Sequence, residues 1–510
     1  MRKRRKALLS GLLLACLLWA SPALAASTLV LADDTPPTTM DPAADNSDST
    51  CSVLVNVFDG LLAREGKEGK IVPGLAEKYE HPDALTWKFI LRQGVKFHNG
   101  NPLTSADVKF SFERLADPKL SKWLETGQAI ASIETPDERT IIFKTKNPTP
   151  WFVSNVHQLF IVSKKDVESR DAGDVGVKPM GTGPYKFVEW VKGSHLKFTA
   201  NEAYWGGAPK IKQVELKIIT EPATRFAALA SGSVDLVSGL PLEMFEQIQQ
   251  NPKLEILSRP SRRVIYLALG NKAGTPLADV RVRRAIYLAI NEDEIIQKVM
   301  QGKASPAAQL ADSASTGFNP ALKRLPFDPE KSKALLKEAG YENGFEITLA
   351  GPNDRYVNDA KIAEAAVQYL NKVGIKAKLD VKPKAVFFPE VTSREKFDFY
   401  LLSWLDGAYD SARGISTNLA TYNKEKGWGG WNGARFSDPE IDALMDQAAA
   451  MVDLAERDKL LQKAHVVIQE KVPLIPLHCG IDLYGLVKDR GVKFTPRPER
   501  WLVYKEIEKN

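Results

Sequence analysis

A strand–helix–strand unit in the second half of the chain constrains the fold more than any other feature. The segments EITLAG (346–351) and GIKAKLDV (374–381) have the composition of short strands. Between them, DAKIAEAAVQYLNKVG (359–374) repeats apolar residues at helical spacing. Strands that alternate with helices in this way build α/β architectures. We therefore predict an α/β fold.

The rest of the chain continues the same mixture of elements. It has 510 residues, of which 44% are hydrophobic, and this is enough for two or more cores. Neither an internal repeat nor a low-complexity tract is apparent. Further strands are predicted at 262–271 and 473–487, and further helices at 281–290, from Asn291, from Asp328 to Gly340, at 437–452 and at 456–472.

The N-terminus has the three parts of a secretory signal peptide. MRKRRK (1–6) is cationic, residues 7–20 are apolar, and SPALA (21–25) supplies small residues. An alternative is lipoprotein processing at Cys16, after LLAC. Because the apolar run continues past Cys16 and an Ala-x-Ala site follows, we predict a periplasmic, soluble protein that is cleaved after Ala25.

The net charge says little about partners. Five of the basic residues behind the formal charge of +6 lie within residues 2–6, so the rest of the chain carries +1. The basic pI is thus mostly a property of the signal peptide, and it does not indicate a nucleic-acid partner.

Two cysteines remain after cleavage, Cys51 and Cys479. In an oxidising compartment they could form a disulfide, and they could equally be two separate buried thiols. No Cys-x-x-Cys is present, so neither a zinc ribbon nor a thioredoxin-like site is indicated.

The stretch LRQGVKFHNGNPLTSADVKFSFERL (91–115) combines His98 with Asp107. Alternation before it predicts a strand, and Asn99-Gly100 predicts a turn. Thr104 followed by Asp107 resembles a capping box at the start of a helix. We therefore interpret His98 and Asp107 as scaffold rather than as a catalytic pair.

Enzyme signatures are absent from the sequence. There is no His-Glu-x-x-His, no Gly-x-Ser-x-Gly and no phosphate-binding loop. The six histidines are scattered without metal-ligand spacing. We predict neither catalysis nor a metal or other cofactor.

Aromatic residues gather with charges in two loops of the second half. SWLDGAYDSARG (403–414) and GWGGWNGARF (427–436) place tryptophans beside glycines and a few charged groups. Aromatic faces supply apolar area and charges orient a ligand's ends, so these loops are typical of a cleft that holds a small polar ligand.

These segments together resemble a known family. GLAEKYE at 74–80 and the stretch that ends at Leu115 are similar to the signature region of the family 5 extracellular solute-binding proteins. That family comprises the peptide- and nickel-type (cluster C) binding components of ABC importers. The similarity continues in order through GTGPYKFVEW, NEAYWGGAPKIKQVELKII, RFAALASGSVDL, DVRVRRAIYLAINEDEII, FDPEKSKALLKEAGY and SDPEIDALMDQA.

The resemblance implies a two-lobed periplasmic-binding-protein (Venus-flytrap) fold with an extra subdomain in the first lobe. Two strand crossovers would join the lobes, near Ala268 to Asn271 and near His478 to Ile481. The implied divisions are a signal peptide at 1–25, lobe I at 26–268 and 482–510 with the extra subdomain at about 61–189, and lobe II at 269–481.

The resemblance also bears on the ligand. Peptide-binding relatives carry an amine-binding Asp three residues after a Trp, and here Gly407 holds that place after Trp404. Asp406 lies one residue earlier, and Asp410 matches a second Asp of the motif. Arginine forks suit carboxylates and phosphates. The predicted ligand-binding residues are Trp404, Asp406, Asp410, Arg413, Arg355, Tyr356, Trp431, Cys51 and His478.

We predict a non-enzymatic binding protein that hands a small ligand, first of all a short peptide, to the ABC permease and its ATPases. Other ligand classes stay open: glycosylated or phosphorylated small molecules, glutathione-like compounds and metal chelates. A nickel chelate is less favoured because 410–430 holds no histidine. A sensor without transport is a further alternative, and a secreted hydrolase is disfavoured. The protein is expected to be a monomer that binds no nucleic acid.

Overall fold

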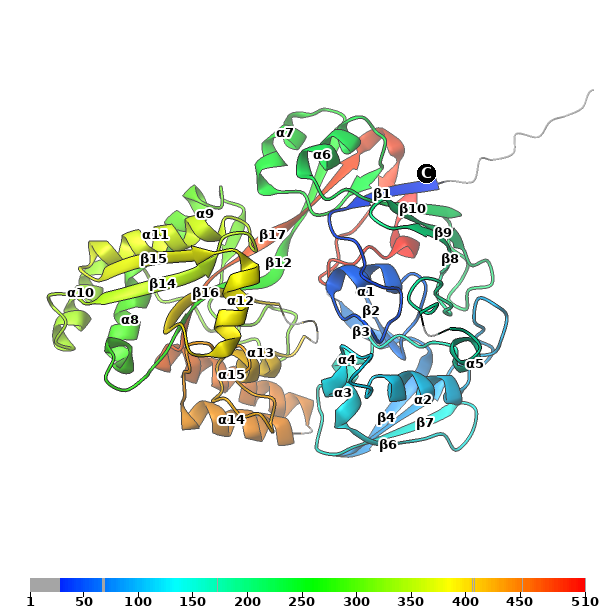
Figure 1. Ribbon diagram of the computed structural model, residues 1–510, viewed down its shortest axis with the longest axis horizontal. Helices are drawn as coiled ribbons and strands as arrows, with labels where there is room; N and C mark the ends of the chain where they lie inside the picture. Colours follow the sequence, from blue (N-terminus) through cyan, green and yellow to red (C-terminus); the bar gives the residue numbers. More distant parts are fainter. Residues whose placement is uncertain are drawn as a thin grey trace, which may run out of the picture.

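The computed structural model describes residues 28–66, 69–171, 173–405, 407, 409–451 and 453–509. The predicted signal peptide, Cys16 and Asp406 lie outside the described residues. Two lobes stand side by side, and two long strands run between them (Figure 1). The α/β fold and the two-lobed form predicted from the sequence are confirmed.

One mixed sheet of 11 strands extends through both lobes. Its hydrogen-bonded order is β15-β14-β16-β12-β17-β11-β1-β10-β9-β8, with β13 added to β17. The strands are β1 (Thr28–Asp33), β8 (Tyr185–Val191), β9 (His195–Ala200), β10 (Gln213–Ile218), β11 (Leu236–Val237), β12 (Leu254–Leu269), β13 (Ala304–Pro306), β14 (Glu346–Pro352), β15 (Lys376–Lys382), β16 (Phe399–Trp404) and β17 (Leu474–Val487).

The strands β12 and β17 connect the lobes. They pair antiparallel over most of their length, with register shifts between Pro260 and Val264 and between Val264 and Tyr266. Side chains of β12 pack with first-lobe residues up to Leu257 and with second-lobe residues from Val264 onward. The sequence-based lobe boundaries at 268 and 482 stay predictions.

The first lobe contains a separate four-stranded sheet in the order β4-β5-β7-β6 and a β2–β3 hairpin. This sheet packs with helices at the lower right of Figure 1. The elements are β2 (Leu62–Glu65), β3 (Lys70–Pro73), β4 (Ala76–Asp83), β5 (Thr86–Leu91), β6 (Ile130–Glu134), β7 (Thr140–Thr145), α1 (Asp48–Leu54), α2 (Ser105–Arg114), α3 (Leu124–Ala129), α4 (Phe152–Asn155) and α5 (Lys164–Glu168).

Most of the longer helices belong to the second lobe, where they pack with its part of the sheet (Figure 1). They are α8 (Val280–Ala289), α9 (Glu292–Lys298), α10 (Pro329–Glu338), α11 (Asp359–Lys372), α12 (Lys384–Ser393), α13 (Ser411–Asn418), α14 (Pro439–Ala450) and α15 (Leu454–Lys471). The first lobe adds α6 (Pro222–Ala230), α7 (Phe245–Gln250) and a small pair, β18 (Val492–Lys493) and β19 (Glu508–Lys509). Short 3-10 helices occupy Leu242–Met244, Pro276–Ala278, Lys488–Arg490 and Tyr504–Glu506. Within the described ranges, no helix has the length and apolarity required to cross a bilayer.

The strand–helix–strand unit is confirmed as β14-α11-β15, with the two strands parallel from Glu346↔Lys376. The unit forms because α11 buries an apolar face that includes Ile362, Ala366 and Leu370 against the sheet. The predicted order of elements in this half of the chain therefore follows from hydrophobic periodicity.

The capping box at the start of α2 is also confirmed, since Thr104 and Asp107 make its reciprocal hydrogen bonds. His98 Nε2 donates to the carbonyl oxygen of Gly183 at 2.9 Å. Burial lowers the pKa of His98 to about 4, so the ring is neutral at pH 7. Both side chains therefore serve the scaffold.

Candidate functional site

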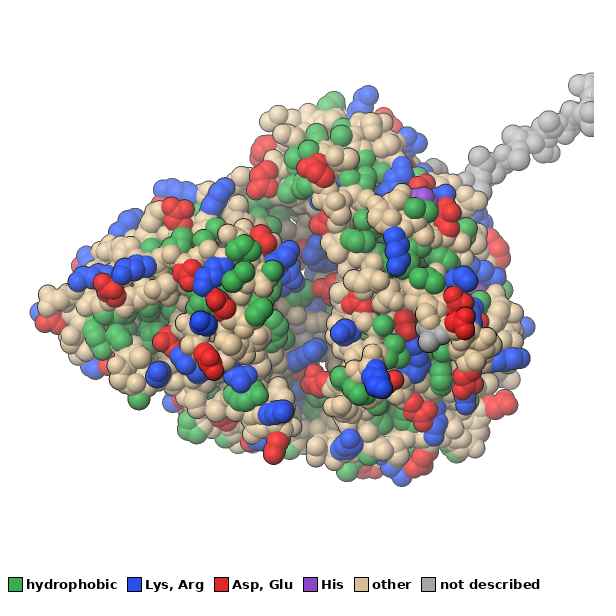
Figure 2. Space-filling view, in the orientation of Figure 1, with side chains coloured by type: hydrophobic (Ala, Val, Ile, Leu, Met, Phe, Trp, Pro, Cys, Tyr) green, Lys and Arg blue, Asp and Glu red, His purple; other side chains and the backbone are tan. Residues whose placement is uncertain are grey.

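A cleft of about 400 Å³ lies between the lobes. Figure 2 shows the molecule hollowed along this line, with basic and acidic side chains near its edges. The volume is within the range of ordinary small-molecule sites. The first lobe contributes Asn46, Ser47, Asp48, Trp123 and Gln158, and the connecting strand and second lobe contribute Arg263, Arg355, Tyr356, Phe388, Leu402, Ser403, Trp404, Leu405, Gly407, Arg413, Asn418 and Trp431.

The structure brings five of the predicted residues together in this cleft. They come from separate loops that the sheet holds side by side: Trp404 ends β16, Arg413 lies in α13, and the others follow β14 or α13. The five are Trp404, Arg413, Arg355, Tyr356 and Trp431.

Asp410 does not line the cleft. Its carboxylate accepts hydrogen bonds from Arg457 Nη1 at 2.5 Å and Nη2 at 3.1 Å, and both side chains are buried. It also caps α13, because Oδ1 accepts from the backbone N–H of Ala412 at 3.0 Å. The structure therefore gives Asp410 a role in the core of the second lobe.

Cys51 and His478 also lie away from the cleft lining. Cys51 is buried in the first-lobe core, and its burial raises the thiol pKa well above the ordinary value. Cys479 is a free thiol as well, with its pKa raised to about 12 by burial. His478 Nδ1 lies 2.6 Å from Glu292 Oε1, and both of these side chains are buried.

Arg263 is the cleft residue that the sequence prediction most clearly missed. It projects from β12 and its Nη1 donates to Ser403 Oγ at 2.9 Å. Burial lowers the pKa of Arg263, and the positive charge of Arg355 lowers it further. Two guanidinium groups that repel one another beside a cleft favour an anion between them. The doublet Arg262-Arg263 at the start of a buried strand was a signal available in the sequence.

Arg355 is held at the cleft by a local turn. Asp359 Oδ2 accepts from the backbone N–H groups of Arg355 at 2.9 Å and of Tyr356 at 3.0 Å. The Tyr356 ring lies 5.5 Å from the Arg355 guanidinium carbon and 5.9 Å from that of Arg263. Within the described part of the chain, the exposed Arg355 guanidinium has neither a hydrogen-bond nor an ion-pair partner.

Asp48 is a carboxylate of the opposite wall. Its side chain is exposed to solvent at the cleft. Partial desolvation of the carboxyl group by the surrounding protein raises the pKa of Asp48, while the charge of Arg263 opposes the shift. The cleft thus presents a carboxylate from the first lobe and two guanidiniums from β12 and the second lobe. Nothing in the local sequence DNSDST distinguished Asp48 from its neighbours.

Aromatic side chains form the apolar parts of the wall. Trp431 and Phe388 pack edge to face with ring centroids 5.7 Å apart. Trp123 is fixed by the hydrogen bond that its indole N–H donates to the Pro42 carbonyl oxygen at 3.0 Å. Such rigid faces bury the apolar body of a ligand while the charges fix its ends.

Gly407, the place of the amine-binding Asp in the resemblance, is joined to the opposite lobe. Its carbonyl oxygen accepts a hydrogen bond from Gln158 Nε2 at 2.7 Å. A Cβ at this position would lie 3.3 Å from that Nε2 atom, so Gln158 fills the adjoining space. No described group of three or more His, Cys, Asp or Glu residues is arranged to hold a metal ion.

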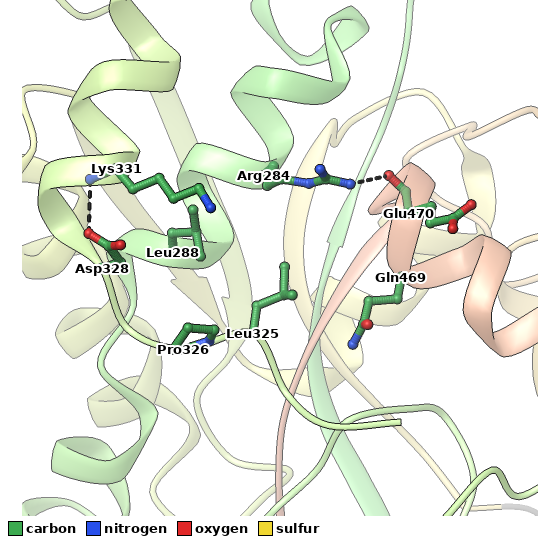
Figure 3. A pocket seen from close by; sticks show the side chains of 8 residues that line it. All are labelled: Arg284, Leu288, Leu325, Pro326, Asp328, Lys331, Gln469 and Glu470. Atoms are coloured by element: carbon green, nitrogen blue, oxygen red, sulfur yellow. Dashed lines mark hydrogen bonds between the residues drawn. The ribbon is translucent and has the colours of Figure 1, made fainter. Parts of the chain in front are cut away.

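A second hollow lies on the second lobe, away from the cleft. Figure 3 shows Leu288 between Arg284 and Lys331, with Leu325 and Pro326 below them in the view, at the meeting of α8, α10 and α15. It measures about 230 Å³. Two of its polar side chains are engaged locally: Arg284 donates to the Glu470 carbonyl oxygen at 3.0 Å, and Asp328 caps α10.

Comparison with known proteins places this geometry in context. The family model described as "Bacterial extracellular solute-binding proteins, family 5 Middle" matches residues 70–426. "Heme-binding protein A" of Haemophilus influenzae is 28% identical over 82% of this chain and 81% of its own. "Glutathione-binding protein GsiB" of Escherichia coli K12 is 29% identical over 91% of both chains. The solved structure of HbpA2 from Haemophilus parasuis is 28% identical, with a TM-score of 0.86 over 95% of this chain and 100% of that chain.

Proposed function

Because this chain belongs to the bacterial extracellular solute-binding proteins of family 5, we propose that its ligand is a short peptide, captured in the cleft between the lobes. The chain is the substrate-binding component of an ABC importer. Its delivery partners are the transmembrane permease subunits and their ATPases.

The arrangement of charges across the cleft carries the peptide proposal. Arg263 and Arg355 lie on one side of it, and Asp48 lies on the other. A peptide has a carboxylate at one end and an ammonium group at the other, which complements this arrangement. The aromatic faces of Trp431 and Phe388 accept the side chains between those ends.

The mechanism is a shift of population between open and closed forms. A ligand that touches Asp48 on the first lobe and Arg355 on the second gains both contacts only when the lobes are together. It therefore stabilises the closed form by its differential affinity, and no covalent step is required. The closed form is then the one presented to the permease.

The proposal includes the route to the site of action. The protein is exported, its signal peptide is cleaved after Ala25, and the mature monomer works in the periplasm. The division between the lobes would lie at the register shift between Pro260 and Val264 and at the facing part of β17, where the packing of side chains changes lobe.

A glutathione-like compound is the second candidate. The relative at 29% identity is named as a glutathione-binding protein. Such a γ-linked tripeptide has one ammonium group and two carboxylates, so the two cleft arginines and Asp48 complement it as well. The two candidates share end groups and differ in their linkage.

Mass spectrometry tests the proposal. The protein is first measured in its native state and then denatured, so that the ligand it has bound is released and identified. The released molecules should be short peptides, and refolded protein should bind them again in calorimetry. Amidation of the peptide's C-terminus should weaken binding strongly, since Arg263 and Arg355 then have no carboxylate to hold. A single non-peptide compound, or binding that is indifferent to amidation, would overturn the peptide assignment.

A further inference from the structure

A short segment of the second lobe reaches across to the first. We call residues 407 and 409–413 the bridging segment. Gln158 of the first lobe donates from Nε2 to the Gly407 carbonyl oxygen at 2.7 Å. At the other end, Arg413 Nη2 lies 3.8 Å from Glu125 Oε2 in α3. The segment therefore joins the lobes at both of its ends.

Between these two contacts, Tyr409 is held by two arginines. The guanidinium carbon of Arg64, from β2 of the first lobe, lies 3.6 Å from the centroid of the Tyr409 ring. That of Arg262, from β12, lies 3.3 Å from the same centroid. The Tyr409 side chain is 3% exposed, so both cation–π contacts are largely shielded from water and correspondingly strong.

Both arginines are anchored by further contacts. Arg64 Nη1 donates to the Gly69 carbonyl oxygen at 2.7 Å, within the first lobe. Arg262 Nε donates to Asp312 Oδ2 at 2.6 Å, on the second-lobe side. The guanidinium groups are thus held in place on each side, and Tyr409 brings its ring to them.

The backbone conformation of Tyr409 is held by contacts with the second lobe. Tyr409 adopts a φ of 60°, in the left-handed region that tyrosine rarely occupies. Its carbonyl oxygen accepts from the backbone N–H of Thr316 at 2.9 Å, which ties it to the second lobe. An unfavourable backbone conformation is retained where surrounding contacts over-determine it.

The faces of the ring, rather than its hydroxyl, make the contact. The Tyr409 hydroxyl is buried and makes no hydrogen bond to any described residue. Opposite it, Gly69 leaves the necessary space, because a Cβ there would lie 3.0 Å from the hydroxyl oxygen. The first lobe is therefore shaped to receive this particular ring.

We propose that Tyr409, clasped between Arg64 and Arg262, is a positioning residue that holds the lobes together before ligand arrives. The inference rests on the proposed function, since it concerns the closing of the same cleft. The clasp makes part of the ligand-free population closed. Affinity then depends on this closed fraction as well as on the contacts in the cleft, because a ligand binds only the competent form.

Small-angle X-ray scattering of ligand-free protein tests the clasp. Protein that has been unfolded, refolded and shown by native mass spectrometry to be empty is compared with Tyr409→Ala and Tyr409→Phe. We expect Y409A to have a larger radius of gyration, because loss of a buried cation–π contact lowers the closed-to-open ratio about tenfold. Y409F keeps the ring and should match the wild type.

Tyr422→Ala is the matched control. The ring of Tyr422 lies under Arg394 at 3.4 Å, but both residues belong to the second lobe. Y422A should leave the radius of gyration unchanged. An identical radius for Y409A and the wild type, or expansion of Y409F to the radius of Y409A, would overturn the clasp.

A second variant covers the case in which Y409A loses its fold. Arg64→Met removes the first-lobe cation and keeps Tyr409 and Arg262, so it should also expand the ligand-free protein. A compact, folded R64M would overturn the proposal. Because these measurements contain no ligand, they can fail while peptide binding stands, and they can succeed even if the ligand is not a peptide.

Discussion

Two arginine sites, in the second lobe and its connecting strand, contain similar charged groups but have different roles. At the first, Arg457 and Asp410 satisfy one another in the core, with both side chains almost fully buried. At the second, Arg263 and Arg355 converge on the cleft, and the carboxylate across from them belongs to the other lobe. The difference indicates that charged groups that pair within the protein stabilise the fold, whereas charged groups without such a partner beside a cleft serve to bind a ligand.

The largest effect expected from this comparison is at the buried pair of Arg457 and Asp410. Asp410→Asn leaves the buried Arg457 without its counter-charge, and breaking such a pair costs about 3–5 kcal/mol. The free energy of unfolding, measured in urea, should fall by that amount. Ligand affinity of the folded protein should not change, since Asp410 does not line the cleft.

Asp446→Asn provides the control for this prediction. Asp446 pairs with Lys426, but its side chain is 54% exposed, so its loss should cost no more than about 1 kcal/mol. Normal stability of D410N together with lost ligand binding would reverse the assignments of the two arginine sites.

The contrast between these sites also shows how far the sequence could predict the molecule. The capping box at Thr104 and the unit β14-α11-β15 depend on residues a few positions apart, so their patterns were readable. The loop with Trp404 and Arg413 was recognisable from its mixture of aromatic and charged residues.

The sequence could not show which charged side chains face the core and which face the cleft. Asp410 and Arg413 share one loop, yet one turns to the core and the other to the cleft. The choice depends on Arg457, a partner 47 positions away that only the folded chain brings near. Asp48 joins the site for the same reason, because closure of the two lobes places it opposite Arg263.

The next largest effect is expected at the cleft, where Arg263 and Arg355 lie. Arg355→Gln removes a guanidinium that has no side-chain hydrogen bond or ion pair within the described chain. We expect peptide affinity to fall about 30-fold, equivalent to about 2 kcal/mol for one lost charged partner. The free energy of unfolding should change by less than about 0.5 kcal/mol. Calorimetry with the peptides recovered from the wild-type protein provides the measurement.

Arg394→Gln is the matched variant for this test. Arg394 also covers a tyrosine ring, that of Tyr422, but it does not line the cleft. R394Q should bind peptide as the wild type does. If both variants bound equally well, recognition of the ligand would not depend on Arg355.

The smallest effect is expected at Asp48, because its charged form at the cleft lowers the stability of the folded protein. The folded protein raises the pKa of this carboxyl above its ordinary value of 3.8, so folding disfavours its charged form. Asp48→Asn removes that cost, and ligand-free D48N should be more stable than the wild type at pH 7. The gain should be complete above the raised pKa and should shrink as the pH falls toward 3.8, where the wild-type carboxyl becomes protonated. Urea unfolding between pH 4 and 8 measures this, and calorimetry should show weaker peptide binding by the same variant. A loss of stability in D48N at pH 7 would mean that Asp48, like Asp410, belongs to the scaffold.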